Sequence, residues 1–169
     1  MSETTKSQLR FFQKDLFEHL TQGTYLAHGV NCMGAMGRGI AVEFKERWPR
    51  MYEEYRAKCK EGRLILGDFH TWQPGLRYFR QQEFLSIKIY NLAIKSHWRN
   101  PASYLAIESS VNLMLDDMSE NGGAVVTMPW IGCGLGGLDK KHSAKILKRC
   151  LAKERPNGRE QQIWVYEGK

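Results

Sequence analysis

The chain has 169 residues, a length typical of one domain, and its 42% hydrophobic and 25% charged residues are typical of a folded protein and not of a disordered one. It contains no run of 18 or more apolar residues, and its first residues lack the apolar core of a signal peptide, so neither a membrane span nor export is supported and a cytoplasmic protein is expected. Lys and Arg number 25 against 18 Asp and Glu, and this formal net charge of +7 favours anionic partners such as nucleic acids or phosphorylated ligands.

Two strands, a turn and two helices are predicted for the first third of the chain. The strands cover residues 9–13 and 25–30, and a glycine-rich turn covers 31–37. A first helix begins near Arg38 and ends before Pro49, after which a second helical stretch follows. The apolar residues at helical spacing that support these helices are Ile40, Phe44, Trp48, Met51, Tyr52 and Tyr55.

The middle of the chain predicts strands and then a long helix. Aromatic and β-branched residues indicate strands within residues 66–72, 76–79 and 84–94. Asn100 and Pro101 are expected to be the N-cap and first residue of the helix, which ends before an Asn-Gly-Gly sequence. Its apolar stripe comprises Tyr104, Ile107, Val111, Leu115 and Met118.

The last third predicts a buried strand at 124–131, a glycine-rich loop, a basic helix at 139–153 and a final strand at 162–167. Asp139 is the expected N-cap of the basic helix. Because strands and helices alternate, the chain is predicted to be an α/β protein, a three-layer α/β/α sandwich around a mixed, mostly parallel central sheet.

Two glycine-rich loops each follow a buried strand and precede a helix. They are Gly34 to Gly39 and Gly132 to Gly137. Glycines let successive main-chain amides approach one anion, and the helix N-terminus adds a favourable dipole, so the two loops together are suited to a diphosphate. The alternative is that the glycines only make tight turns. A nicotinamide-binding fold, a P-loop NTPase and a kinase are disfavoured, because their motifs are missing or misplaced.

The four cysteines are Cys32, Cys59, Cys133 and Cys150, and they include no C-x-x-C pair. Without a histidine at ligand spacing, a zinc site has no support, and reduced thiols are expected. Cys32 and Cys133 lie within the glycine-rich loops, where a nucleophilic role is the alternative to an inert thiol.

The order of four segments resembles the macrodomain family of ADP-ribose-binding modules over nearly the whole chain. The segments are Asp15-Leu16, AHGVNCMGAMGRGIAVEFKERWP, IYNLAIKSHWR and MPWIGCGLGGLD. The sequence is most similar to the branch that contains terminal ADP-ribose glycohydrolases and the antitoxin macrodomains that remove ADP-ribose from thymidine in DNA. The resemblance implies one macrodomain over residues 1–169.

The resemblance also implies a role for individual residues. Asp15 would accept a hydrogen bond from the adenine amino group, with Leu16 beside it, and Tyr166 would contact the adenosine side. Asn31 would hold the distal ribose, and Lys95 would attack or engage its anomeric carbon. The residues that would help to hold the distal ribose are Gly37, Arg38, Gly39 and Ile40, and those that would bind the diphosphate are Gly132, Cys133, Gly134, Leu135, Gly136 and Gly137.

Two positions depart from related branches. Arg38 stands where the better-known hydrolases have an aspartate, and Gly136 stands where many macrodomains have an aromatic residue and one protein glycohydrolase has a catalytic aspartate. The Arg38 departure disfavours the water-activating scheme of those hydrolases, and the Gly136 departure disfavours a protein glycohydrolase. The GCGLGGLD loop and the K-x-H-W-R segment, which resemble those of the antitoxin branch, favour ADP-ribose linked to a nucleobase in DNA as substrate. The alternatives are removal of ADP-ribose from acidic protein side chains, ADP-ribose 1''-phosphate phosphatase activity, and reading of ADP-ribose without catalysis.

The chemistry of Lys95 supports a covalent route. An amine can form a transient Schiff base with the opened sugar, which water then hydrolyses, and Asn31 can orient hydroxyl groups without carrying charge. Trp98 either stacks on a base or covers the core, and His97 is expected at the surface. No metal or cofactor is required, and a monomer is expected, with single-stranded DNA as a possible partner. The basic helix presents either a phosphate-binding or a solvated face, formed by Lys140, Lys141, Lys145, Lys148, Arg149 and Lys153.

Overall fold

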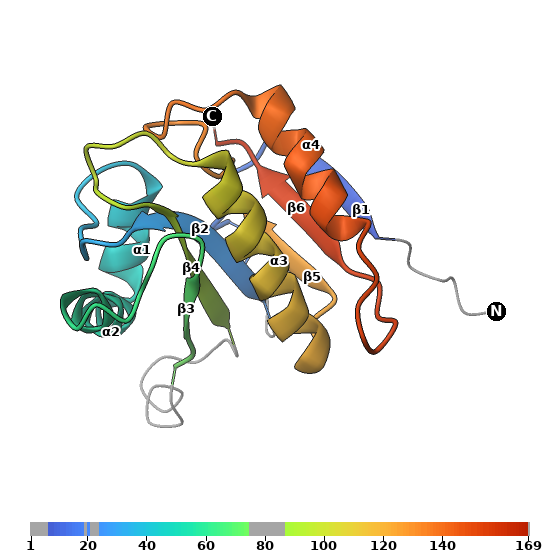
Figure 1. Cartoon of the computed structure of the whole chain (residues 1–169), viewed down its shortest axis with the longest axis horizontal. Coiled ribbons are helices and arrows are strands. Elements are labelled where there is room, and N and C mark those ends of the chain that lie inside the picture. Colours follow the sequence, from blue (N-terminus) through green and yellow to red (C-terminus); the bar gives the residue numbers. More distant parts are fainter. Residues whose placement is uncertain (1–6, 19, 21–23, 75–86, 169) are drawn as a thin grey trace.

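A computed structural model describes residues 7–18, 20, 24–74 and 87–168. In this part of the chain a six-stranded sheet lies between two layers of helices (Figure 1). In chain order the elements are β1 (Gln8–Phe12), β2 (Tyr25–Asn31), α1 (Ile40–Arg47), α2 (Pro49–Lys60), β3 (Phe69–Trp72), β4 (Lys88–Lys95), α3 (Tyr104–Glu120), β5 (Val125–Met128), α4 (Lys140–Leu151) and β6 (Gln162–Tyr166). The predicted three-layer α/β/α sandwich is confirmed.

The sheet has the strand order β1-β6-β5-β2-β4-β3 and is parallel except for β3, which pairs antiparallel with β4. Strand β4 is buried along nearly its whole length, as expected for a parallel strand covered on both faces. Since the carboxyl ends of parallel strands meet at one edge, the chain after Asn31 of β2 and after Lys95 of β4 emerges side by side.

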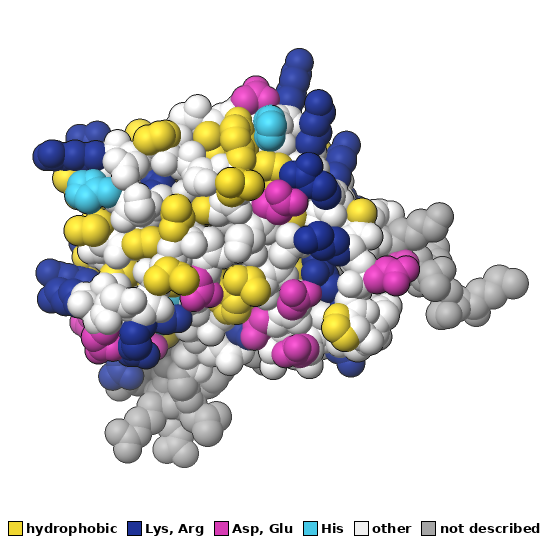
Figure 2. Space-filling model, viewed as in Figure 1, with side chains coloured by type: hydrophobic (Ala, Val, Ile, Leu, Met, Phe, Trp, Pro, Cys, Tyr) yellow, Lys and Arg dark blue, Asp and Glu magenta, His cyan; other side chains and the backbone are white. Residues whose placement is uncertain are grey.

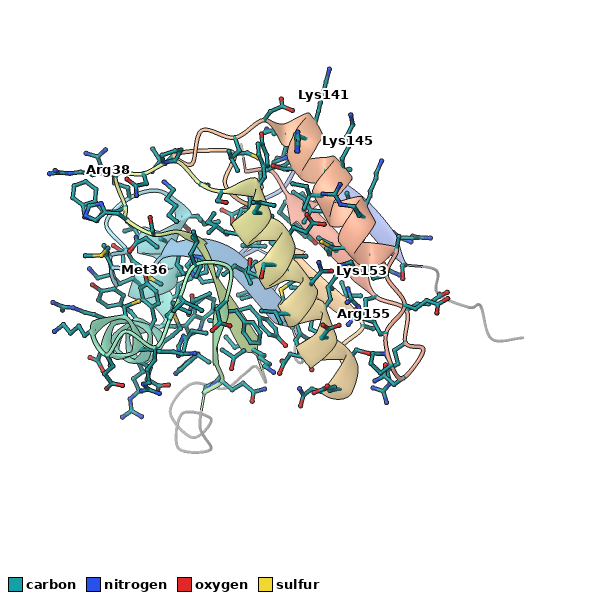
Figure 3. All side chains as sticks on the ribbon, in the orientation of Figure 1. Met36, Arg38, Lys141, Lys145, Lys153 and Arg155 are labelled. Carbon is teal, nitrogen blue, oxygen red and sulfur yellow. The ribbon has the colours of Figure 1, made fainter. Side chains whose placement is uncertain are left out.

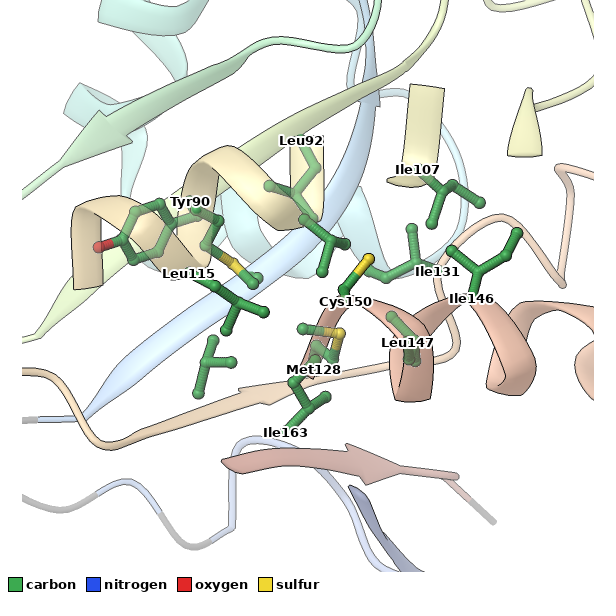
Figure 4. Packing of buried hydrophobic residues seen from close by; sticks show 14 of the residues in the cluster. Tyr90, Leu92, Ile107, Leu115, Met128, Ile131, Ile146, Leu147, Cys150 and Ile163 are labelled. Carbon is green, nitrogen blue, oxygen red and sulfur yellow. The ribbon is translucent and has the colours of Figure 1, made fainter. Parts of the chain in front are cut away.

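Each face of the sheet has its own hydrophobic core. Helices α1 and α2 cover one face through Phe44, Met51 and Tyr55, which are fully buried. Helices α3 and α4 cover the other face, where the side chains from the two helices and the strands interdigitate (Figure 4). In the predicted stripe of α3 every residue except the partly buried Tyr104 is fully buried. This packing fixes the strand edge from which the loops extend.

The start of α3 differs from the prediction. The helix begins at Tyr104, and its N-cap is Ser103, whose side chain accepts a hydrogen bond from the amide of Ala106 at 3.2 Å. Asn100 and Pro101 lie outside the helix, because the amide of Ala102 donates to the carbonyl of Gly136 at 3.1 Å and holds this segment against a distant loop. At α4 the predicted cap is confirmed, since the carboxylate of Asp139 accepts from the amide of His142 at 2.8 Å.

The remaining predicted elements agree with the structure within a few residues. The strand expected within 66–72 begins only at Phe69, because Gly67 has a φ of 87° and its amide turns to the carbonyl of Ala93. The strand expected at 76–79 lies outside the described residues. Across the described ranges, no helix is long and apolar enough to span a membrane.

Candidate functional site

A cavity of about 1160 Å³ opens at the carboxyl ends of the central strands, between the two glycine-rich loops. The two loops therefore lie side by side, as the sequence predicts. The predicted site residues that line the cavity are Asn31, Gly37, Arg38, Gly39, Ile40, Lys95, Gly132, Cys133, Gly134, Leu135, Gly136 and Tyr166. Asp15, Leu16 and Gly137 are not among its lining residues.

The first loop is shaped by Asn31, the last residue of β2. The side-chain oxygen of Asn31 accepts hydrogen bonds from the amides of Met33 at 3.0 Å and Ala35 at 3.2 Å, and its Nδ2 donates to the carbonyl of Ala35 at 2.8 Å. The hydroxyl of Tyr55 donates to the main-chain oxygen of Asn31 at 2.5 Å. Asn31 thus fixes the loop from within, while its second Nδ2 hydrogen is the group left for a ligand.

This loop ends at α1, whose N-terminus adjoins the cavity. Gly39, the N-cap, has a φ of 61°, a conformation that other residues rarely adopt. No side chain caps the helix, so its first amides are not satisfied by a cap. Gly37, Gly39 and Ile40 line the cavity at a position where the helix dipole favours an anion.

The second loop is a compact turn closed by main-chain hydrogen bonds. The amide of Leu138 donates to Gly132 and that of Gly137 donates to Gly134, both at 3.0 Å. A Cβ at Gly136 would overlap the carbonyl oxygen of Gly132, whereas a Cβ at Gly134 would meet open space. Glycine is required at Gly136 by close packing of the loop and not by its dihedral angles, which explains why an aromatic residue does not occupy this position.

Lys95 joins the two loops. It ends β4 beside Asn31, and its carbonyl accepts from the amide of Cys32 at 2.9 Å. Its side-chain Nζ lies in the cavity wall and donates to the carbonyl of Leu135 in the second loop at 3.2 Å. The amine is thus held next to the main chain that would bind the diphosphate.

The other end of the cavity contains Trp130 and Glu167, which sequence reasoning missed, and Lys140, which it assigned only to the basic face of α4. The carboxylate of Glu167 accepts hydrogen bonds from Lys140 Nζ at 2.9 Å, from Gln13 Nε2 at 2.7 Å and from the indole of Trp130. These hydrogen bonds lower the pKa of Glu167 to about 2, so it is ionised at neutral pH. The only sequence signal for this cluster was the proximity of each residue to a strand end or loop.

Tyr166 lies at the same end, on the last residue of β6. Its ring stacks on Phe12 of the neighbouring β1, with centroids 5.0 Å apart and planes at 21°. Burial raises the pKa of Tyr166, which keeps its hydroxyl protonated. Tyr166 lines the cavity, and its contact with the adenosine side stays a prediction.

Comparison with known proteins decides the family. Residues 27–147 match the family model of the Macro domain. The chain belongs to the macro domain family. The match begins in β2 and ends within α4, so it includes both glycine-rich loops and Lys95.

Relatives of this macro domain include proteins with a known reaction. A DNA ADP-ribosyl glycohydrolase of Mycobacterium tuberculosis is 35% identical over 114 residues, which cover 68% of this chain and 31% of that protein. The solved macrodomain of Mycobacterium tuberculosis DarG has a TM-score of 0.78 at 28% identity and covers 94% of this chain and 97% of that one. Thermosipho africanus DarTG in complex with ADP-ribose has a TM-score of 0.77 at 26% identity, with 96% of this chain and 42% of that chain covered. The chain spans about a third of the length of the first of these relatives.

Asp15 and Leu16 lie outside the cavity wall. Asp15 is exposed in the turn that follows β1, and its Oδ1 accepts from the amide of Phe17 at 2.7 Å. Leu16 is buried in the core beneath α1. The second carboxylate oxygen of Asp15 is the atom that an adenine amino group would have to reach, and this role stays a prediction.

The four cysteines of the chain are free thiols. Burial raises the pKa of Cys32 and of Cys133, the two that lie in the glycine-rich loops. The thiol of Cys133 donates to the hydroxyl of Ser143 at 3.2 Å. A raised pKa disfavours the thiolate that a nucleophile requires, which agrees with inert thiols at both positions.

The basic face of α4 is partly neutralised. Lys140 pairs with Glu167, and Arg149 pairs with Glu108 through two hydrogen bonds of 2.9 and 3.0 Å. Figure 2 shows Lys and Arg side chains projecting in a row over α4. Those that form no ion pair within the described residues are Lys141, Lys145, Lys148 and Lys153.

Proposed function

We propose that this macro domain binds ADP-ribose and hydrolyses the bond that joins its distal ribose to thymidine in single-stranded DNA, with Lys95 as the catalytic residue. The observation that supports this most directly is the position of Lys95 Nζ, 3.2 Å from the carbonyl of Leu135 and in the same cavity as both glycine-rich loops. A diphosphate held by the loops puts the distal ribose within reach of one amine.

Binding would depend on main chain more than on side-chain charge. Residues 132–136 of the second loop, and Gly39 and Ile40 at the N-terminus of α1, line a space that accepts a dinucleotide-sized ligand. Lys140, the cation at the far end, is already paired with Glu167. We therefore expect the diphosphate to lie between the loops and the adenosine to extend toward Tyr166.

Cleavage would start when positive charge develops at C1 of the distal ribose and the bond to the base breaks. The amine of Lys95 attacks C1 as the base departs, so that a C–N bond replaces the bond to the base, and one amine proton passes to the departing base. The ring C1–O bond then breaks, the ring oxygen takes the second amine proton, and the C1=N bond of a Schiff base forms. Water then adds to C1, and breaking the C–N bond returns free ADP-ribose and the amine. Asn31 serves as a positioning residue, because its carboxamide shapes the loop that faces the ribose.

The test is release of free ADP-ribose from thymidine-linked single-stranded DNA and from glutamate-linked protein by wild type, Lys95→Ala and Lys145→Ala. Lys145 is exposed on α4 outside the cavity, so its variant controls for loss of one charge. We expect DNA turnover that disappears only in Lys95→Ala. Turnover of the protein adduct alone would reassign the acceptor, and tight ADP-ribose binding without turnover of either substrate would make the domain a reader.

A further inference from the structure

The turn that follows β4 forms the cavity wall next to Lys95. Its base is anchored, since the amide of Ser103 donates to the carbonyl of Ile94 at 3.0 Å and the amide of Ala102 donates to Gly136 at 3.1 Å. Its tip is also ordered, because the amide of Arg99 donates to the Nδ1 of His97 at 3.1 Å. The side chains at the tip are therefore presented by a fixed main chain.

Trp98 is the large apolar side chain at this tip. The residue is 48% exposed and lines the cavity, so part of a large aromatic surface is accessible there. The ring of His97 stacks on it with centroids 5.2 Å apart and planes at 30°. The guanidinium of Arg99 lies 4.6 Å from the Trp98 ring centroid. Aromatic rings and planar guanidinium groups are the surfaces on which unpaired bases stack.

The positive charge of the cavity wall is only partly neutralised by ion pairs. Among the described residues that line the cavity, Arg38, Lys95, Arg99 and Lys140 are cationic and Glu167 is acidic. Only Lys140 of these cations forms an ion pair within the described part of the chain. Three cations without an ion pair among the described residues, Arg38, Lys95 and Arg99, thus line the same cavity as Trp98 and would attract a polyanion there.

We propose that Trp98, Arg99 and Arg38 form the binding site for the acceptor strand, which is single-stranded nucleic acid. The modified base stacks on Trp98, and the phosphates that flank it contact Arg99 and Arg38. This assignment rests on the proposed function, because the acceptor is attached to C1 of the ribose next to Lys95. It assigns a strand-binding role to the turn after β4 and not to α4.

Two features separate this site from other candidate surfaces. An acidic side chain of a protein acceptor would need only the cations for binding. The stacked side chains of His97, Trp98 and Arg99 are suited to a planar base instead. Lys141 and Lys145 of α4 do not line the cavity, and they lie well apart from Arg38, toward the top right of the view while Arg38 lies at the left (Figure 3). A strand attached at Lys95 therefore meets Arg38 and Arg99 first.

The test compares two substrates, the thymidine nucleoside linked to ADP-ribose and the same adduct within a short single-stranded oligonucleotide. Trp98→Ala is expected to lower kcat/KM by about 10- to 100-fold on both, because stacking on the modified base is lost. Trp98→Phe keeps a ring and is expected to retain most activity. Arg99→Gln is expected to lower kcat/KM more on the oligonucleotide than on the nucleoside, and to reduce the slope of log kcat/KM against log salt by about 0.7.

Lys145→Gln is the matched control, because it also removes one unpaired positive charge, and no change is expected. ADP-ribose binding by each variant checks that the cavity is intact. Wild-type-like kinetics of Trp98→Ala and Arg99→Gln on both substrates would overturn the proposal, as would an equal loss in Lys145→Gln or dependence on Trp98 for a glutamate-linked protein alone. If wild type turns over neither DNA substrate, the proposed function itself fails and the strand site with it.

Discussion

The side-chain Nζ of Lys95 donates a hydrogen bond to the main-chain oxygen of Leu135. The amine that we propose as the catalytic group therefore connects the end of β4 to the second glycine-rich loop. An amine held by one carbonyl is oriented without being consumed in an ion pair, since Lys95 forms none within the described residues. Binding of ligand at the loop and positioning of the amine are therefore coupled through a single contact.

A first prediction concerns the covalent intermediate. Sodium borohydride added during turnover reduces the carbon–nitrogen double bond of a Schiff base to a secondary amine, which leaves ADP-ribose attached to the lysine. We expect mass spectrometry of the digested protein to find this adduct on Lys95 and to find none in Lys95→Ala. An adduct on Lys140, the second lysine that lines the cavity, would contradict the assignment of Lys95 as the catalytic residue. Turnover without any adduct would favour direct attack by water.

A second prediction tests Asp15, which lies outside the cavity wall. If its free carboxylate oxygen accepts a hydrogen bond from the adenine amino group, an analogue with hypoxanthine in place of adenine should bind wild type about 10-fold more weakly or worse. Asp15→Ala should bind the two ligands alike, as calorimetry can measure. Glu18→Gln, a nearby exposed acid, is the control and should keep the preference. A preference for adenine that survives in Asp15→Ala would remove Asp15 from the site.

A third prediction uses two glycines of one loop. A Cβ at Gly136 would overlap the carbonyl oxygen of Gly132, so Gly136→Ala should cost about 1–3 kcal/mol and lower the Tm by about 2–12 °C. Gly134→Ala adds its methyl group to open space and should keep the wild-type Tm. Thermal unfolding followed by circular dichroism measures both. Equal Tm values for the two variants would show that the loop adjusts without cost.

Elements with a strong local pattern could be predicted from the sequence. Strand β4 is buried on both faces and therefore has a continuous apolar run, and helix α3 is buried on one side and therefore has an apolar stripe. Both patterns can be recognised in the local sequence. The glycine-rich loops could be predicted because they join a strand to a helix at one edge of a parallel sheet. The cavity between them follows from the same argument.

Features that depend on distant contacts could not be predicted. Asn100-Pro101 is locally as good a helix start as Ser103, and the choice is made by hydrogen bonds from residues 102 and 103 to Gly136 and Ile94. Glu167 reaches the site because Gln13, Trp130 and Lys140 converge on its carboxylate. Likewise, nothing in the sequence reveals that the Asn31 carboxamide is used within its own loop.

A last prediction concerns stability in acid and a buried polar network between the sheet and α1 and α2. His28 Nε2 lies 2.6 Å from the Oδ1 of Asn91, and the Nδ2 of Asn91 donates to the Nδ1 of His70 at 3.0 Å. The ring of His28 stacks on Phe44 at a centroid distance of 3.8 Å. Burial lowers the pKa of both histidines from 6.5 to about 4, opposed at His28 by the Asn91 hydrogen bond and reinforced at His70 by the charge of Lys58.

Since both pKa values are lower in the folded state, the unfolded chain binds more protons between pH 6.5 and pH 4. The free energy of unfolding should therefore be constant above this window and fall as the pH decreases through it, by about 1.4 kcal/mol per pH unit for each histidine. Urea unfolding at a series of pH values measures this slope. His70→Gln should reduce the slope by about 1.4 kcal/mol per pH unit, whereas His142→Gln, at an exposed position on α4, should leave it unchanged. Carboxylates affect the same range in all three proteins, so the difference between the slopes isolates the histidine. An unchanged slope in His70→Gln would show that this histidine titrates normally in the folded protein.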